Sequence, residues 1–213
     1  MSGVQAAGRG VGKVGAAGAA VDAGAAGAAG AAGAAGALGA SVDAGIVVGL
    51  ARPDEFEAVD RLIDAAYRHD YGPSEHQDPS RFAAVRAAHF DVWVARAGDE
   101  LLGSVTTRRA GGPSLHERVP EGELDLRLLG VSPAARRRGI GALLMRHVLE
   151  HAAGVGFSGV TLKTQKYMTG AHRLYEELGF VRAPERDGLW IGDEKVLDLI
   201  AYRRDTDRRV DAD

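Results

Sequence analysis

Three arginines and two glycines stand close together in the middle of the chain, in the run Arg136-Arg137-Arg138-Gly139-Ile140-Gly141. Glycine has no Cβ, so a ligand can approach its backbone closely. The first N–H groups of a helix have no partner within the helix, and the helix dipole adds positive potential there. Arginine adds donors that match phosphate oxygens. If a helix begins at this run, these residue types predict a site for a phosphate or pyrophosphate.

The flanking patterns predict that a strand leads into this run and a helix leads out of it. Between residues 124 and 131, leucines alternate with polar residues, which is typical of a strand. Pro133 has no backbone donor, so it ends that strand. From Ile140 onward, apolar residues recur at helical spacing. On these residues alone, a tight turn beside a solvated basic helix end is a competing interpretation, because short glycine motifs often arise by chance.

The pattern Arg136-x-x-Gly139-x-Gly141 resembles the Q/R-x-x-G-x-G/A signature of the GNAT superfamily of acyl-CoA-dependent N-acetyltransferases. The resemblance extends upstream through residues 129–133, which are similar to the family's L-x-V-x-P lead-in. It extends downstream to residues 171–180, which are similar to its second signature, A-x-x-L-Y-x-x-x-G-F. It covers roughly residues 46–203. One departure is Met168, which stands where many members carry an asparagine that contacts the cofactor.

The resemblance implies an α+β fold with a mixed, mostly antiparallel sheet of six or seven strands, flanked by helices. In that family the fourth and fifth strands splay apart, and the pantetheine arm of coenzyme A lies in the splay. The pyrophosphate lies on the amides of the glycine run. We therefore expect acetyl-CoA as co-substrate and no metal. The expected cofactor-binding residues are Leu129, Gly130, Val131, Arg136, Arg137, Arg138, Gly139, Ile140, Gly141 and Ala142.

The expected reaction moves an acetyl group from acetyl-CoA to a primary amine by direct attack in a ternary complex. One group must take the amine proton, and another must protonate the departing thiolate. Tyr175 lies at the family's general-acid position; packing on an amphipathic helix is the competing interpretation. Asp125 lies where many members carry a glutamate. Because Asp is shorter, we expect it to act through water, and a solvated strand residue is the alternative. Glu123 is a weaker rival for the base.

The acceptor is expected to be a small-molecule or peptide amine. The residues expected to line its site are Tyr71 and Trp93, with His76, His116 and Trp190 as further candidates. Ordinary packing is the competing explanation for each of them. The alternative function is a non-catalytic acyl-CoA-binding or sensing module of the same fold. A tyrosine at 175 and an acidic residue at 125 favour the enzyme.

Composition narrows the partners and the compartment. The formal net charge is −3, which gives no general attraction to nucleic acid or anionic membranes, so neither is an expected partner. The basic run also lacks the interleaved aromatic residues of a nucleic-acid patch. The chain has no cysteine, which excludes disulfides and a cysteine nucleophile and agrees with a cytoplasmic location. His147 and His151 have helical spacing but no evident third metal ligand. A homodimer would be in keeping with the family, in which dimers are common.

Residues 1–45 differ from the rest of the chain. Most of them are Ala or Gly, largely in repeats of Ala-Ala-Gly, and none is aromatic or proline. With almost no bulky side chain to bury, this segment is predicted to be a disordered tail. A signal peptide is a weaker interpretation because glycine is too frequent, and a start codon assigned too far upstream is another. The predicted domain spans residues 46–203, and residues 204–213 form a charged C-terminal tail.

The remaining patterns predict the other elements of the domain. They are a strand at 46–51, a helix capped by Asp54 with Glu57 as its partner, a helix from Ser80 to about His89, a hairpin of 91–96 and 101–107, a strand at 160–163, a helix with Thr169 as N-cap, a strand beginning at Phe180, and a last strand at 196–202.

Overall fold

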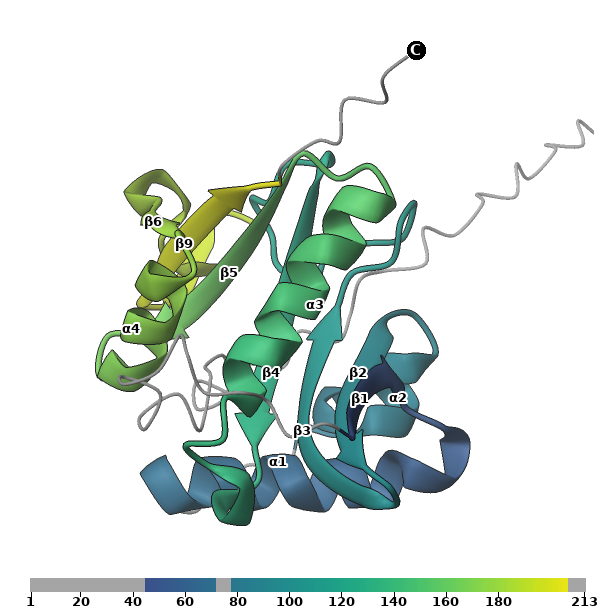
Figure 1. Cartoon of the computed structure of the whole chain (residues 1–213). Coiled ribbons are helices and arrows are strands. Elements are labelled where there is room, and N and C mark those ends of the chain that lie inside the picture. The colour runs from purple at the N-terminus through teal and green to yellow at the C-terminus, as the bar shows by residue number, and fades with distance from the viewer. Residues whose placement is uncertain (1–44, 72–77, 207–213) are drawn as a thin grey trace, which may run out of the picture.

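The computed structural model describes residues 45–71 and 78–206, and for residues 70 and 71 the backbone alone (Figure 1). The predicted N-terminal tail, apart from Gly45, lies outside the described residues, as do residues 207–213. The last strand runs to Asp205, slightly past the predicted end of the domain. Within the described ranges, no helix is both long enough and apolar enough to cross a membrane.

Seven strands form one sheet in the order β1-β2-β3-β4-β5-β9-β6. β4 and β5 are parallel, and every other neighbouring pair in this sheet is antiparallel. The mixed, mostly antiparallel sheet that the sequence predicted is therefore confirmed. A separate hairpin pairs β7 with β8. The strands are β1 Ile46–Leu50, β2 Asp91–Ala97, β3 Glu100–Thr107, β4 Glu123–Val131, β5 Gly159–Gln165, β6 Val181–Arg182, β7 Leu189–Ile191, β8 Glu194–Leu197 and β9 Leu199–Asp205.

The central strands β4 and β5 separate partway along. Their parallel ladder runs from Glu123 to Leu126 on β4 and ends there, although β4 continues to Val131 and β5 to Gln165. Leu128 has a φ of 53°, and the ladder between β3 and β4 shifts register nearby. A bulge of this kind bends its strand, so β4 turns away from β5. This is the splay that the family resemblance implies.

Helices cover both faces of the sheet, and α3 crosses its near face in Figure 1. The helices are α1 Phe56–Tyr71, α2 Ala83–Ala87, α3 Ile140–Gly154 and α4 Thr169–Glu177. A Cβ on Gly103 of β3 would lie 2.9 Å from the Ile140 side chain of α3, and one on Gly130 of β4 would lie 2.8 Å from Ile63 of α1. Gly130 pairs with Ser104, so the two glycines face opposite sides of the sheet. Both glycines allow a helix to approach the sheet closely.

The helical backbone leading into the first helix begins earlier than the sequence predicted. A 3-10 turn, Pro53–Glu55, precedes α1, and Arg52 is the N-cap in place of Asp54. The backbone N–H of Arg52 donates to the carboxylate of Glu55 at 2.6 Å, so Glu55 takes the capping role expected of Glu57. The proline is the reason: its fixed φ suits the first helical position, and the chain turns there.

The other differences concern element ends. The second predicted helix is a 3-10 turn at 79–81 followed by the short α2. The predicted last strand is divided: β8 pairs with β7, whereas β9 pairs with β5 and β6. The apolar run at 196–202 thus belongs to two sheets, which its alternation does not reveal. Met168, and not Thr169, is the N-cap of α4.

Candidate active site

The turn between β4 and α3 has an unusual backbone. Arg137 has a φ of 62° and Gly139 a φ of 76°, and α3 starts at Ile140. No side chain caps the N-terminus of α3, whose N-cap residue is Gly139 itself. The amides of the first turn, residues 140–142, are therefore free of a side-chain cap, and the helix dipole makes this end positive. We call residues 129–142 the cradle; its helix end is suited to bind an anion.

The two glycines of the motif have different roles. A Cβ on Gly139 would meet no atom within 4 Å, so this glycine provides the left-handed backbone and leaves space in front of the helix. A Cβ on Gly141 would lie 3.3 Å from Leu174 of α4 and 3.8 Å from Val131 of β4. Gly141 therefore allows α3 to start close to α4. The sequence predicted that both glycines let a ligand approach the backbone. At Gly141 the close neighbours are protein atoms, from Leu174 and Val131.

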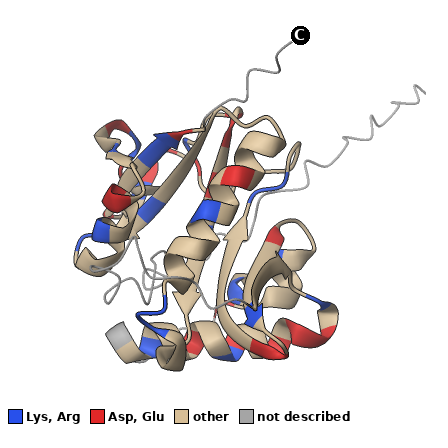
Figure 2. Cartoon of the chain, in the orientation of Figure 1, with Lys and Arg blue, Asp and Glu red and all other residues tan. Residues whose placement is uncertain are grey.

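The three arginines before α3 have different surroundings, in a turn that is blue in Figure 2. The Arg136 guanidinium donates from Nη1 to Nδ1 of His69 at 2.9 Å and from Nη2 to the Ala66 carbonyl at 3.4 Å. Arg137 is exposed, and Arg138 is half-buried. Arg136 thus ties the turn to the end of α1, whereas Arg137 lies in solvent at the start of α3.

The last residues of β4 offer a backbone edge. On one side, Gly130 and Val131 pair with Ser104 and Gly103 of β3. On the other side the β5 ladder has already ended, and no described strand pairs with Leu129, Gly130 or Val131 there. The side chains of Leu129 and Val131 are buried and Gly130 has none, so the backbone is what these residues offer to a ligand. The cradle thus combines an open strand edge with a helix N-terminus.

Tyr175 lies on α4 and is 1% exposed. Its ring centroid is 6.0 Å from that of Phe180 and 5.8 Å from that of Tyr202 on β9. The preceding residue, Leu174, contacts the start of α3 at Gly141. Tyr202 donates from its hydroxyl to Glu176 at 2.9 Å; burial and this carboxylate raise its pKa to about 12. An aromatic cluster therefore surrounds Tyr175 beside the cradle, and the sequence did not predict Tyr202 as its member.

Asp125 is completely buried, which excludes the alternative of a solvated strand residue. Its Oδ2 accepts a hydrogen bond from the backbone N–H of His116 at 2.7 Å and lies 3.2 Å from Nδ1 of the same residue. His116 belongs to the loop between β3 and β4 and is 6% exposed. Sequence reasoning had placed His116 only among possible acceptor contacts. The fold brings it directly onto the candidate carboxylate.

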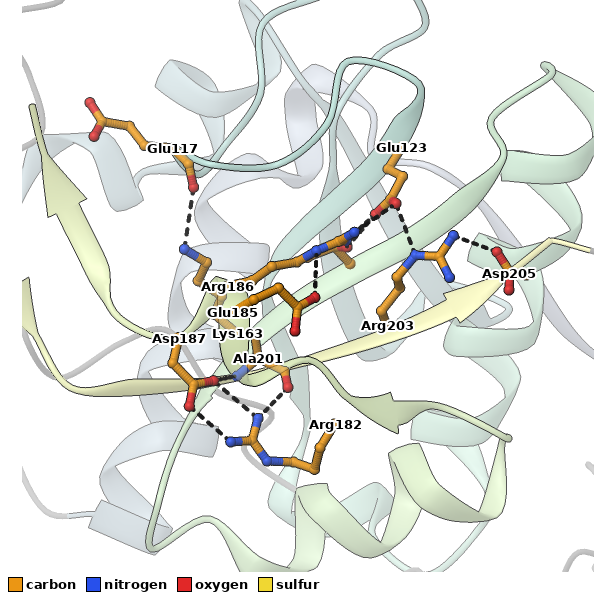
Figure 3. A network of polar contacts seen from close by, with 11 residues as sticks. Glu117, Glu123, Lys163, Arg182, Glu185, Arg186, Asp187, Ala201, Arg203 and Asp205 are labelled. Atoms are coloured by element: carbon orange, nitrogen blue, oxygen red, sulfur yellow. Dashed lines mark hydrogen bonds and ion pairs between the residues drawn. The ribbon is translucent and has the colours of Figure 1, made fainter.

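Lys163 on β5 is a further buried charge on this face, and the sequence did not single it out. It is 4% exposed, and its Nζ donates to the carbonyl of Gly188 at 2.7 Å. Its Nζ also donates to the carbonyl of Glu117 at 3.3 Å (Figure 3). Burial lowers the pKa of Lys163 to about 8, although the nearby Asp125 acts in the opposite direction. Asp125 pairs with Thr161, which is two positions before Lys163, so all three lie on one face of the sheet.

Glu123, the weaker candidate for the base, is held by cations. Both Oε atoms accept from Arg186, and Oε1 also accepts from Arg203 at 2.9 Å (Figure 3). Burial would raise the pKa of Glu123, but hydrogen bonds from Arg186, Thr161 and Arg203 outweigh it and lower the pKa. A carboxylate stabilised in this way is a poor proton acceptor. We call His116, Glu123, Asp125 and Lys163 the polar cluster.

Trp93 lies on the other face of the sheet. Its ring centroid is 4.5 Å from that of His147 and 4.9 Å from that of His151, both on α3. The strand ladders place Trp93 on the same side as Leu126, and so opposite Asp125. Trp93 therefore shares no surface with the polar cluster.

Of the other residues expected to contact the acceptor, the structure describes the side chain of Trp190 but not those of Tyr71 and His76. Tyr71 is the last residue of α1, and its side chain lies outside the described residues, as does all of His76. Trp190 lies on β7 beneath the Arg118 guanidinium, whose carbon is 3.5 Å from the ring centroid. Its Nε1 donates to the carbonyl of Asp187 at 3.0 Å. The hairpin of β7 and β8 is thus joined to the loop that carries His116.

Comparison with known proteins identifies relatives of this domain. Residues 56–180 match the model of the Acetyltransferase (GNAT) family. N-acetyltransferase 8 of Mus musculus is 36% identical over 122 residues, which are 56% of this chain and 51% of that protein. The chain thus spans about half the length of this curated relative.

Solved structures share the fold. An acetyltransferase of the GNAT family from Staphylococcus aureus Mu50 has a TM-score of 0.60 at 17% identity, covering 76% of this chain and 99% of that one. A Salmonella typhimurium protein, solved with its cofactor acetyl-CoA, has a TM-score of 0.56 at 17% identity, covering 79% and 98%. At these identities the likeness establishes the fold alone, and it agrees with the predicted sheet flanked by helices.

Proposed function

Because this chain belongs to the acetyltransferase (GNAT) family, we propose that it transfers the acetyl group of acetyl-CoA to a primary amine by direct attack in a ternary complex. The observation that carries the proposal is the cradle. An uncapped helix N-terminus at Gly139 adjoins the edge of β4, which has separated from β5. An anion site beside an open strand edge suits a ligand that has both a pyrophosphate and an amide-bearing arm.

The residues of the cradle fit acetyl-CoA. The amides of residues 140–142 would hold the pyrophosphate, and the exposed Arg137 adds positive charge beside them. The open space in front of Gly139 leaves room for phosphate oxygens. The backbone of Leu129, Gly130 and Val131 would pair with the amides of the arm. When bound, acetyl-CoA supplies a thioester that an amine can attack.

Two side chains are assigned to proton movement in this proposal. Tyr175 would protonate the departing sulfur from its hydroxyl; α4 holds it next to Leu174, which contacts the start of α3. Its burial keeps bulk water away from the hydroxyl. Asp125 would serve the deprotonation of the amine, and its burial means that it acts through another group.

The acceptor would approach on the face of β4 that carries Asp125, opposite α3. The loop between β3 and β4 and the hairpin of β7 and β8 both lie over this face, joined through Lys163 and through Arg118 on Trp190. We expect these segments to shape the acceptor site. The class of acceptor that follows from the family is a primary amine, in a small molecule or a peptide.

An acceptor screen tests the proposal. The full chain is incubated with acetyl-CoA and one amine at a time. The amines are spermidine, free amino acids, an aminoglycoside, a peptide with a free N-terminus and a lysine peptide. Release of free thiol is followed, and the acetylated product is identified by mass spectrometry. The proposal expects acceptor-dependent thiol release with at least one of these amines. Tight acetyl-CoA binding without acetylation of any amine would favour the sensing module instead.

A further inference from the structure

The contact between Asp125 and His116 has the geometry of a carboxylate that orients an imidazole. Oδ2 of Asp125 lies 3.2 Å from Nδ1 of His116 and also accepts the backbone N–H of His116 at 2.7 Å. The same carboxylate oxygen of Asp125 therefore contacts both the ring and the backbone of His116. A carboxylate at Nδ1 favours the tautomer with a proton on Nδ1, which leaves Nε2 as the basic nitrogen.

Asp125 has no surface of its own to offer an acceptor. It is 0% exposed, whereas His116 retains 6% exposure. Among the described residues, His116 Nε2 has no hydrogen-bond partner, while Nδ1 is committed to Asp125. A proton that leaves an amine on this face can thus reach the carboxylate only by way of another group, and the imidazole is already in place.

The loop that carries His116 is fixed on both sides. The buried Arg108 guanidinium donates to the carbonyls of Gly112, Glu121 and Glu123 at 2.9, 2.9 and 3.1 Å, which ties the two ends of the loop together. The residue after His116, Glu117, accepts from Lys163 through its carbonyl at 3.3 Å. A base is effective when it is held in position, and these contacts hold the ring without occupying Nε2.

Several other charged side chains lie near the His116–Asp125 pair. Asp125 on β4 contacts the His116 ring. The neighbouring Lys163 on β5 interacts electrostatically with Asp125, with Glu117 and Arg118 of the loop, and with Asp187 before β7. Lys163 is bound to two carbonyls, and Glu123 lies further along β4 in its own pairs with Arg186 and Arg203. Asp125 is thus the carboxylate in direct contact with the imidazole, and it would stabilise the imidazolium.

We propose that His116 is the general base of the reaction and that Asp125 is a positioning residue that acts through it. The assignment rests on the proposed function. The proton moves from the acceptor nitrogen to Nε2, the electron pair stays on the acceptor nitrogen, and the ring becomes an imidazolium beside the Asp125 carboxylate. This replaces the water expected from the sequence with a side chain.

A tautomer measurement tests the assignment without turnover. The full chain is labelled with 15N-histidine, and long-range 1H–15N correlations are recorded, with His116→Gln used to identify the signals. We expect the neutral His116 ring to carry its proton on Nδ1 and none on Nε2. A proton found on Nε2 instead would overturn the assignment, because the nitrogen facing away from Asp125 would then be a donor.

Measurements of kcat then distinguish the role of His116 from that of Asp125. With an amine that the wild type acetylates, His116→Gln is expected to lower kcat by about 100-fold or more, with little change in acetyl-CoA affinity. Asp125→Asn is expected to lower kcat less and to move the acidic limb of the pH–rate profile to lower pH, because the imidazolium loses its neighbouring charge. The exposed His89, changed to Gln, is the matched control and should retain full activity.

The two proposals fail in different ways. If the wild type acetylates amines and His116→Gln, folded by its melting curve, keeps full kcat and the same acidic limb, His116 is not the base, and the proposed function stands. If the wild type acetylates no amine, the proposed function fails, and the role of His116 fails with it.

Discussion

The cradle and the polar cluster lie on the same strand, β4, but are built in different ways. The cradle is a continuous stretch of backbone whose shape depends on Gly139 in the left-handed conformation. The polar cluster is made of side chains from β4, β5 and the loop before β4, and arginines from beyond α4 complete it. The cradle depends on the backbone conformation of a few residues. The polar cluster depends on buried charged side chains that need partners of opposite charge or hydrogen bonds. We therefore expect substitutions in the cradle to change cofactor binding, and those in the polar cluster to change chemistry or stability.

The largest effect is expected at Tyr175, which lies beside the cradle but is assigned to chemistry. Tyr175→Phe should lower kcat by roughly 10- to 1000-fold, because a general acid typically contributes about 100- to 10,000-fold and water partly replaces the lost hydroxyl. Acetyl-CoA affinity by calorimetry should change little, since the phenyl ring keeps the contacts with Phe180 and Tyr202. Tyr202→Phe is the control, and it should keep its turnover. Full turnover in Tyr175→Phe would make Tyr175 a packing residue.

The next effect is expected on stability, at the centre of the charge network in Figure 3. Glu123→Gln leaves Arg186 and Arg203 without their buried carboxylate and should lower the free energy of unfolding by about 2 kcal/mol near neutral pH. Because the pKa of Glu123 is lowered in the folded protein, this stabilisation is present above pH 4.5 and is lost as pH falls through the folded pKa. Urea unfolding at several pH values measures both.

The matched control for Glu123 is Glu185, whose exposed carboxylate lies 3.3 Å from the same Arg186. Glu185→Gln should change stability by less than about 0.5 kcal/mol, since exposed pairs contribute little. Equal losses in the two variants would show that burial does not set the strength of this network.

The smallest effect is expected at Lys163. Its folded pKa of about 8 lies below the ordinary 10.5, so the unfolded chain binds more protons between these values, and stability rises with pH there. Relative to Lys163→Met, the wild type should gain about 1 kcal/mol between pH 8 and pH 9, measured by thermal unfolding. Lys166→Met, at an exposed lysine, should run parallel to the wild type. A constant difference between the wild type and Lys163→Met across this range would contradict the lowered pKa.

These two regions also differ in how much the sequence predicts. The cradle could be recognised because its strand, proline, glycines and helix follow one another, and each has a local signature. Only the second role of Gly141 was missed, because it depends on Leu174, which is distant in sequence. The family resemblance predicted a mixed sheet of six or seven strands, and alternation within the strands supported it; the observed sheet has seven.

The polar cluster could be predicted only in part. Asp125 was identified through the resemblance, but its burial beneath His116 depends on a loop that carries no regular pattern. Lys163 reads as an ordinary polar residue of an alternating strand, and its partners Gly188 and Glu117 come from two separate segments. The division of the last apolar run at Asp198 is hidden for the same reason, because alternation does not say which strand is the partner.

The central claim is that the start of α3 binds the phosphates of acetyl-CoA, and Gly139 tests it most directly. Asp and Asn have nearly the same shape, and both tolerate the left-handed backbone that Gly139 adopts. Gly139→Asp and Gly139→Asn therefore differ mainly in one negative charge in front of the helix. By calorimetric titration with acetyl-CoA, the Asp variant should bind at least about 10-fold more weakly than the Asn variant. Equal affinity of the wild type and both variants for acetyl-CoA would contradict the account.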